Sequence, residues 1–186
     1  ITINISSPNT EDLRSFHEDK KLHNLLEAIN KEKANLGSKI PIAVKVSPDI
    51  DDQEIQRITE VLLSNKIEVI IVSNTSDSSR DSLSNIQKYQ KGGLSGKPIE
   101  DKTTNLISKF YNIINGRIKI IGVGGVDSGI GAYKKFLAGA DYVQLYTGMV
   151  YRGPNIVSII KKELKELLLK QGVKNFSEII GKKTDS

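Results

Sequence analysis

The stretch "IKIIGVGG" (residues 118–125) decides the fold prediction, because an apolar strand runs directly into a glycine-rich turn. The next strand-like stretch, "DYVQLYTG" (residues 141–148), ends in a similar turn at Tyr146 and Thr147. In (β/α)8 barrels a phosphate site is frequently built from the loops after the seventh and eighth strands. The two stretches therefore predict the last two strands of such a barrel, with a phosphate site at their carboxyl ends.

Three more strands are predicted upstream, at residues 1–5, 40–48 and 67–75, where short apolar runs end in polar or proline-containing turns. Helical periodicity fills the intervals, and the predicted helices cover residues 11–36 and 51–66, the segments around Leu106–Ile114 and Tyr133–Leu137, and residues 156–171. The tail from residue 175 predicts one further turn. Alternating strands and helices are typical of right-handed βαβ units in one parallel sheet.

A doubly wound open sheet is the competing architecture. Dinucleotide binding there usually needs GxGxxG after a strand, but "GVGGVD" (122–127) has Asp127 in place of the third glycine. "GGLSGKP" (92–98) is not a P-loop, since its glycines are one residue too close and Pro98 replaces Ser or Thr. We therefore expect an α/β protein of the (β/α)8 TIM-barrel class. Its residues 1–186 would supply about five β/α units, strands four to eight, with the first three strands outside this sequence.

Composition narrows the possible functions. The 186 residues are 38% hydrophobic and 26% charged, which suits one globular domain with a core. The absence of Cys excludes disulfides and a thiol nucleophile, and two His residues without ligand spacing predict no metal site. The net charge of +5 comes from Lys interleaved with Glu rather than from an Arg-rich stripe, so we expect no nucleic-acid binding. No apolar run is long enough to span a membrane.

Polar side chains gather where the predicted strands end, which is the ligand-binding edge of a parallel sheet. Amide side chains can match the alternating donors and acceptors of a uracil-like ring, although Asn is also common in turns. Asn4 is unusual because strand interiors disfavour Asn. It shares parity with Ser6 and opposes the neighbouring isoleucines, so we expect it to point into the barrel.

Other candidate residues have a plain structural explanation as well as a functional one. Lys45 lies within a strand, where a buried Lys is rare unless paired; the alternative is a side chain that reaches solvent. Ser7 is a poor base without a relay, for which Thr10 is the local candidate, and it can equally be a turn residue. Gly124 and Gly125 allow a backbone to approach a phosphate, or simply make a tight turn.

Two further features are predicted to lie at the surface. His17 and His23 are separated by a spacing that does not stack them on one helix face, and we expect both to be exposed. The Ser- and Asp-rich stretch at residues 76–91 is expected to be a solvated loop. As a hypothesis, this loop forms part of an active-site lid.

Six motifs in order resemble those of dihydroorotate dehydrogenase: "NISSPNT" (4–10), "KVSPD" (45–49), "SNT" (73–75), "GGLSGKP" (92–98), "IIGVGGVDSG" (120–129) and "AGADYVQLYTGMVY" (138–151). The resemblance covers essentially the whole chain. Ser7 stands where class 1 enzymes carry Cys, which indicates the class 2, membrane-associated branch. The resemblance implies an oxidoreductase, a flavoprotein with FMN in a TIM barrel. It would oxidise dihydroorotate to orotate in de novo pyrimidine (UMP) biosynthesis and pass the electrons to a quinone.

The resemblance also implies roles for individual residues. Ser7 would be the base that removes the C5 proton while hydride leaves C6 for the flavin, with Thr10 in the proton relay. The substrate would be held by Asn4, Asn9, Asn74 and Thr75. The FMN contacts would be Asn4, Lys45, Ser73, Gly96, Gly124, Gly125, Tyr146 and Thr147. Ser73 departs from the Thr expected at its position but keeps the hydroxyl.

The portion of the family fold that precedes Ile1 would carry further FMN contacts and the helical extension that takes up quinone. The full-length protein would then be peripheral on the bacterial cytoplasmic membrane, or on the mitochondrial inner membrane of a eukaryote. The chain alone would expose two sheet edges, so we expect poor solubility or self-association and no turnover. Two alternatives stay open. One is another FMN-barrel reductase of the dihydropyrimidine or dihydrouridine type, which normally uses Cys; the other is an inactive half-barrel that only binds phosphate ligands.

Overall fold

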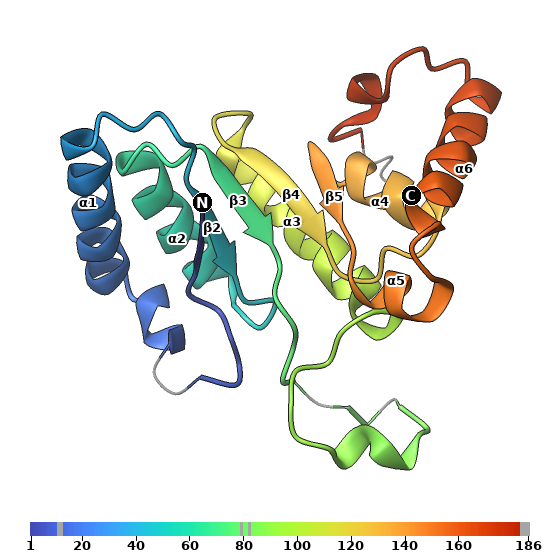
Figure 1. Ribbon diagram of the computed structural model, residues 1–186, viewed down its shortest axis with the longest axis horizontal. Helices are drawn as coiled ribbons and strands as arrows, with labels where there is room; N and C mark the ends of the chain where they lie inside the picture. Colours follow the sequence, from blue (N-terminus) through green and yellow to red (C-terminus); the bar gives the residue numbers. More distant parts are fainter. Residues whose placement is uncertain (11–12, 79, 82, 183–186) are drawn as a thin grey trace.

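A five-stranded parallel sheet forms the centre of the computed structural model, which describes residues 1–10, 13–78, 80–81 and 83–182. The strands are β1 (Thr2–Asn4), β2 (Ala43–Val46), β3 (Val69–Val72), β4 (Lys119–Val123) and β5 (Tyr142–Gln144), and they lie side by side in sequence order (Figure 1). A doubly wound sheet reverses its strand order at a switch point, whereas a barrel does not. The unbroken order therefore confirms the barrel prediction.

Helices follow the strands as predicted. The α-helices are α1 (Asp19–Asn35), α2 (Asp52–Ser64), α3 (Glu100–Ile114), α4 (Gly129–Leu137), α5 (Thr147–Arg152) and α6 (Ile156–Lys170). Short 3-10 helices are η1 (Leu13–His17), η2 (Ile86–Tyr89), η3 (Lys97–Ile99) and η4 (Phe176–Ile179). The first helical segment is thus split in two, and its predicted start at residues 11 and 12 lies outside the described residues. Helix α5 was not expected from the sequence.

The hydrophobic core lies between the helices and one face of the sheet. Strand residues such as Val44, Ile70 and Ile120 are fully buried there against α1, α2 and α3, with Leu26 and Phe110 among the helix residues in contact. A second buried cluster joins α4 to α6 and η4. Alternation along each strand turns the remaining side chains to the opposite face, which therefore belongs to the inside of the barrel.

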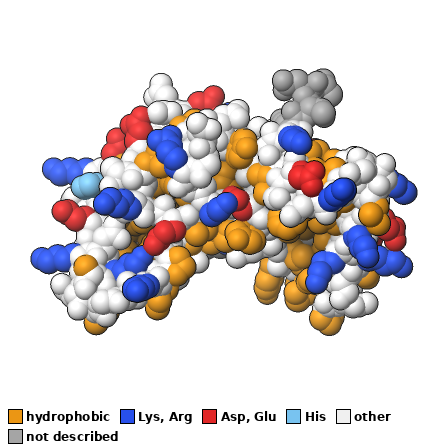
Figure 2. Space-filling view, turned by 90° about the horizontal axis from the view of Figure 1, so that it is seen from above, with side chains coloured by type: hydrophobic (Ala, Val, Ile, Leu, Met, Phe, Trp, Pro, Cys, Tyr) orange, Lys and Arg blue, Asp and Glu red, His pale blue; other side chains and the backbone are white. Residues whose placement is uncertain are grey.

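The inner face carries one transverse row of side chains that is fixed by strand register. Asn4 pairs with Lys45, Lys45 with Ile71, Ile71 with Ile121, and Ile121 with Tyr142. In the described residues no helix packs on this face, and Tyr142 is 58% exposed. Figure 2 shows hydrophobic side chains gathered along the hollowed side of the molecule, while Lys and Arg are scattered over the face in view.

Three sequence expectations need correction or completion. His17 was expected to be exposed but is buried, because η1, of which it is the last residue, lies against α1. His23 is exposed, and its Nδ1 lies 3.0 Å from Asn65 Nδ2. The strands are shorter than predicted, because the polar residues that follow each one leave the sheet to form the loops of the site. Within the described part of the chain, no helix is long and apolar enough to cross a membrane.

Candidate active site

Two strand ends place their amide side chains in direct contact. Asn74 follows β3, and its Nδ2 donates to Asn4 Oδ1 at 3.2 Å and to Ser6 Oγ at 3.1 Å. Ser6 Oγ also donates to Asn4 Oδ1 at 3.1 Å. The parity argument for Asn4 and Ser6 is therefore confirmed: both lie on the inner face, and residues 70 positions apart in the chain converge there.

The loop after β1 brings Ser7 and Thr10 together. Thr10 Oγ1 donates to Ser7 Oγ at 3.4 Å, and the Asn9 backbone N–H donates to the same oxygen at 3.3 Å. Ser7 is half-buried, whereas Asn9 and Thr10 are exposed. Two donors directed at one hydroxyl oxygen favour negative charge on that oxygen, which is what a serine needs to accept a proton from a substrate.

Lys45 stands beside Asn4 on the inner face, in the adjacent strand. Its side chain is half-buried, and burial lowers the pKa of its ammonium below the usual value. Among the described residues, Lys45 Nζ has no hydrogen-bond or ion-pair partner. A partly desolvated cation without a partner suits an electron-rich or anionic ligand placed over the inner face.

The second group of predicted residues lies around the segment that precedes α3. Gly96 has φ 77°, and a Cβ there would lie 2.8 Å from Thr147 Cγ2, so glycine is required both for its conformation and for the close approach. Thr147 Oγ1 donates to Ser95 Oγ at 2.9 Å. The structure thus brings together this segment and the turn after β5, two places where FMN contacts were predicted.

The glycine turn after β4 packs on the first turn of α3. Gly125 has φ 75°, and a Cβ there would lie 2.7 Å from Glu100 Cα. Thr103 Oγ1 lies 3.3 Å from the carbonyl oxygen of Gly124. Glu100 is buried, and its Oε2 pairs with Lys97 Nζ at 2.6 Å. The glycine turn after β4 and the first turn of α3 are therefore in direct contact, although they are distant in the sequence.

Some predicted residues make fewer contacts. Tyr146 is 80% exposed, and its hydrogen bonds among the described residues are made by its backbone carbonyl, which accepts from the N–H groups of Met149 and Val150. Ser73 is buried, and its Oγ donates to the backbone carbonyl of its neighbour Asn74. Thr75 uses its backbone N–H to donate to Asn74 Oδ1 at 2.8 Å. Gly93, which was quoted only as part of a motif, packs so closely against Thr75 and Pro8 that no side chain would fit.

Asp49 anchors the long loop that follows β3. Its carboxylate accepts hydrogen bonds from Ser76 Oγ at 2.6 Å, from the Asp77 backbone N–H at 2.9 Å and from Lys102 Nζ. These bonds hold the pKa of Asp49 well below its usual range. Backbone bonds between Ser76 and Leu94, at 3.0 and 2.6 Å, close the loop at its base. The two ends of the loop are therefore held together, and Asp49 attaches its base to the loop after β2. A loop held only at its base can serve as a lid.

Replacing Asp49 by asparagine is expected to increase proteolytic cleavage within residues 80–91 about tenfold, because the charged anchor becomes a weaker neutral one. Limited trypsin digestion followed by mass spectrometry measures this effect. Asp52→Asn is the matched control, since Asp52 pairs with exposed Lys109 on the outer helices. Equal cleavage of both variants would show that Asp49 does not hold the loop.

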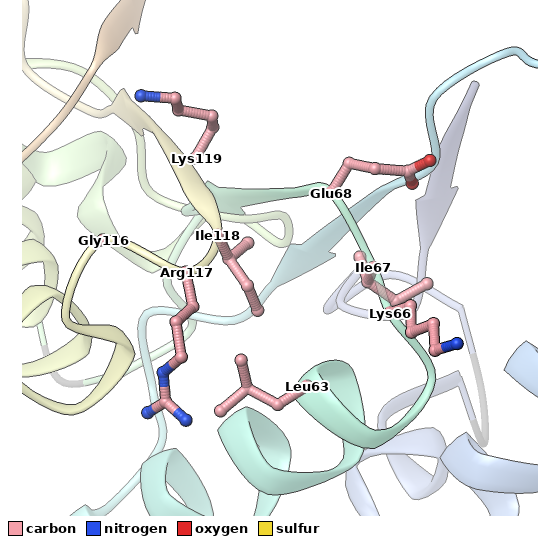
Figure 3. A pocket seen from close by; sticks show the side chains of 8 residues that line it. All are labelled: Leu63, Lys66, Ile67, Glu68, Gly116, Arg117, Ile118 and Lys119. Carbon is pink, nitrogen blue, oxygen red and sulfur yellow. The ribbon is translucent and has the colours of Figure 1, made fainter.

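A pocket of about 450 Å³ lies at the opposite, amino ends of β3 and β4. Figure 3 shows that Lys66 and Lys119 point away from one another and that Arg117 points toward Leu63. Arg117 is also bonded to the carbonyl oxygens of residues 113 and 114 at the end of α3. These cations do not converge on one point, so this pocket has no anion-binding geometry.

Lys135 of α4 was missed from the sequence, although the small neighbours on its helix face, Gly131 and Ala132, are a signal of close packing. Its side chain is fully buried. Lys135 Nζ donates to Glu100 O at 2.8 Å, to Thr103 Oγ1 at 2.6 Å and to Thr104 Oγ1 at 2.7 Å. Burial lowers the pKa of Lys135 to about 7, although the nearby carboxylates of Glu100 and Asp101 raise it in part.

This shift predicts a pH-dependent stability. Between pH 7 and pH 10.5 the unfolded chain holds a proton that folded Lys135 lacks, so the free energy of unfolding should rise with pH in that window. Relative to Lys135→Met, the wild type should gain about 2 kcal/mol between pH 7 and pH 9, as measured by urea unfolding. The other charged groups near this ammonium, Glu100, Asp101, Lys97 and Lys134, are the same in the wild type and in Lys135→Met. Lys134→Met keeps Lys135, so the difference in free energy of unfolding between it and the wild type should not change over this pH range. If the difference between the wild type and Lys135→Met also stays constant, the shift in the pKa of Lys135 is contradicted.

The fold and site define a (β/α)-barrel protein that gathers amides, a paired serine, an unpartnered lysine and a glycine cradle at the carboxyl ends of its strands. Residues 1–168 match the family model of dihydroorotate dehydrogenase, and the chain belongs to that family. It is 44% identical over 170 residues to dihydroorotate dehydrogenase (quinone) of Vibrio cholerae, covering 88% of this chain and 50% of that protein. The corresponding protein of Cereibacter sphaeroides is 39% identical over 180 residues, covering 97% of this chain and 51% of the relative.

Solved structures agree with this family. The crystal structure of DHODH from Eimeria tenella in complex with ferulenol has a TM-score of 0.94 and 33% identity, with 100% of this chain and 54% of that chain covered. The ligand-free form from the same organism has a TM-score of 0.93 and 34% identity, with coverages of 100% and 56%. The chain thus spans about half the length of the relatives that it matches.

Proposed function

We propose that this chain, residues 1–186, is the C-terminal portion of one FMN-binding (β/α)8 barrel. In its full-length form this barrel oxidises dihydroorotate to orotate in pyrimidine biosynthesis and passes the electrons to a quinone. The observation that carries the proposal is the convergence of Asn4 and Asn74 beside the unpartnered ammonium of Lys45, with the Ser7–Thr10 pair in the next loop. Family membership supports it, and the relatives named as quinone-dependent support the choice of electron acceptor.

The proposed substrate site uses amides for recognition and Ser7 for proton transfer. Asn4, Asn9, Asn74 and Thr75 bind the pyrimidine ring and its carboxylate, because amide groups match both its N–H and its C=O groups. Ser7 Oγ accepts the C5 proton while its own hydroxyl proton moves to Thr10 Oγ1, the hydrogen bond between the two hydroxyls running from Ser7 to Thr10 at that moment. Thr10 then gives up its proton to solvent, to which it is exposed.

The residues present fit FMN. At Gly96, Gly124 and Gly125 a Cβ would collide with Thr147, Thr103 and Glu100, so glycine lets these turns lie close together. Backbone N–H groups of such turns can bind a phosphate, and we call this group of turns the phosphate cradle. Tyr146 and Thr147 complete the phosphate end, while Asn4, Lys45 and Ser73 contact the ring system. FMN, when bound, supplies the hydride acceptor. The chain contributes the positive charge of Lys45, which stabilises negative charge that develops on the ligand above it.

The absence of Cys argues against the dihydropyrimidine and dihydrouridine types of reductase, which normally use that residue for proton transfer. Quinone uptake and peripheral attachment to a bacterial cytoplasmic or mitochondrial inner membrane would belong to parts of the full-length protein outside this sequence. A water-soluble quinone should therefore support turnover of the full-length protein, whereas fumarate and NAD⁺ should not.

The test combines intact mass with an absorbance spectrum of the purified protein. We expect a flavin band near about 450 nm that is bleached by dihydroorotate under anaerobic conditions. Bleaching by dihydrouracil but not by dihydroorotate would favour the other class of reductase. A species of 20.5 kDa that binds phosphate but neither retains flavin nor oxidises dihydroorotate would favour the inactive half-barrel.

A further inference from the structure

The buried ammonium of Lys135 connects two parts of the fold that form the phosphate cradle. Lys135 belongs to α4, which begins shortly after the glycine turn at residues 124 and 125. Its three acceptors all belong to the first turn of α3, the helix that follows Gly96 and η3. The ammonium has three N–H donors and each has an acceptor, so its orientation is fully determined.

The same turn of α3 is the surface on which the glycine turn rests. Thr103 Oγ1 accepts from Lys135 Nζ, and its one proton has three acceptors within reach, Ile99 O at 2.9 Å, Glu100 O at 3.1 Å and Gly124 O at 3.3 Å. A Cβ on Gly124 would lie 2.8 Å from the same Thr103 Oγ1. Gly125 packs in the same way on Glu100, whose carbonyl is another acceptor of Lys135. Thr104 binds Lys135 but has no contact with the glycine turn among those described.

We propose that Lys135 is a positioning residue that, through Thr103, holds the first turn of α3 against the Gly124–Gly125 turn and so sets the width of the phosphate cradle. The proposal rests on the proposed function, in that FMN phosphate is the anion bound. A buried charge generally costs stability and is often replaceable by an apolar side chain without loss of folding. We therefore assign to the buried charge of Lys135 the role of fixing the distance between two loops, rather than a contribution to stability.

The proposal separates binding from chemistry. Lys135 lies behind the glycine turn and is fully buried, so it does not touch the ligand. Its loss should weaken FMN binding because the two walls no longer keep one spacing before the ligand arrives. At saturating FMN, the rate of bleaching by dihydroorotate should remain unchanged.

The first experiment compares adjacent lysines in the full-length protein that carries this chain. At pH 6, where Lys135 is mostly protonated, Lys135→Met should raise the Kd for FMN about tenfold, which is the loss expected for charge-assisted hydrogen bonds. Quenching of flavin fluorescence measures this Kd. Lys134→Met removes the same charge from an exposed neighbour, 4.0 Å from Glu100 and Asp101, and should change the Kd less than twofold. If the two variants raise the Kd equally, the proposal is overturned, because positive charge near the site would then explain the effect without any positioning by Lys135.

The second experiment asks whether the hydroxyl of Thr103 transmits the effect. Thr103→Val keeps the shape and removes the hydroxyl, so it should raise the Kd about fivefold, whereas Thr103→Ser should restore wild-type binding. Thr104→Val removes another acceptor of Lys135 without reaching the glycine turn and should have little effect. Thr103→Val added to Lys135→Met should cause no further loss, because both act through one contact.

A ligand-free readout keeps the proposal decidable if FMN does not bind. Amide hydrogen exchange at residues 124–126 should accelerate about tenfold in Lys135→Met and Thr103→Val, and should not accelerate in Lys134→Met or Thr104→Val. If the wild type does not bind FMN but the four variants show this exchange pattern, the proposed function is overturned and the positioning role is supported. Uniform exchange across all four variants would overturn the positioning role, whatever the wild type binds.

Discussion

Ser7→Ala in the full-length protein is expected to slow the bleaching of bound flavin by dihydroorotate by about 10²- to 10⁴-fold, the range that a positioned general base contributes. The physical reason is the pair of donors at Ser7 Oγ, from Thr10 Oγ1 and the Asn9 N–H, which stabilise developing charge on that oxygen. Alanine keeps the backbone conformation set by Pro8 but removes the proton acceptor. Anaerobic stopped-flow absorbance near the flavin band measures the rate.

Two variants make the Ser7 result specific. Thr10→Ala keeps the serine and removes one of its donors, so it should slow bleaching by a smaller factor of about ten. Ser7→Cys restores an ionisable acceptor with a lower pKa, so its rate should recover and its pH profile should move to lower pH. FMN affinity should be unchanged in all three variants. Bleaching by Ser7→Ala within threefold of the wild-type rate would remove Ser7 from the role of base.

Lys45→Met is expected to slow bleaching by about 10²- to 10³-fold, because it removes a preorganised cation from a partly desolvated position. Lys45 Nζ is not used by any described protein group, so its loss should not leave a buried carboxylate unpaired and should cost little stability. Lys119→Met is the matched control. Lys119 lies on the same face of the sheet but pairs with Asp141 at 2.7 Å, near the amino ends of the strands, and its loss should leave the rate within twofold.

The lowered pKa of Lys45 adds a pH signature. Burial disfavours its charged form, so the lysine should lose its proton, and the rate should fall, at a pH below the ordinary lysine value of 10.5. Lys45→Arg keeps a charge that does not titrate in this range and should remove the alkaline fall, even if its shape lowers the plateau. A Lys45→Met variant with wild-type rates would show that the site does not use this cation.

Local sequence patterns predicted much of the site, and particular residues show why. Asn4 and Ser6 were placed on the inner face by strand parity alone, because alternate residues of a strand point to opposite faces. The rule that parallel strands end at one edge placed Asn74 at the same edge as Asn4 and Ser6, and the structure adds its hydrogen bonds to both. The glycine turn at residues 124 and 125 was found from a strand that ends in glycines. Each of these inferences depends on a few neighbouring residues.

Contacts between distant segments were not predictable in this way. His17 was expected to be exposed, since nothing in its neighbourhood indicates that η1 folds back onto α1. Asp49 appeared only as part of a motif, and its role as anchor depends on Ser76 and Lys102, which lie 27 and 53 residues away. Gly93 required the meeting of two loops, those after β1 and β3, before its lack of a side chain had an explanation.

The sequence by itself determined the order of strands and helices and the edge of the sheet at which the polar side chains gather, and the family resemblance supplied most of the residues proposed to act there. Periodicity, turn residues and strand parity are local, and a chain of this length repeats them often enough to define the fold class. Only the tertiary structure decided that Lys135 is buried beneath the first turn of α3 and that Lys45 meets no hydrogen-bond or ion-pair partner among the residues that the structure describes. Both depend on how helices and strands far apart in the chain pack against one another, because burial and pairing are properties of the space between elements.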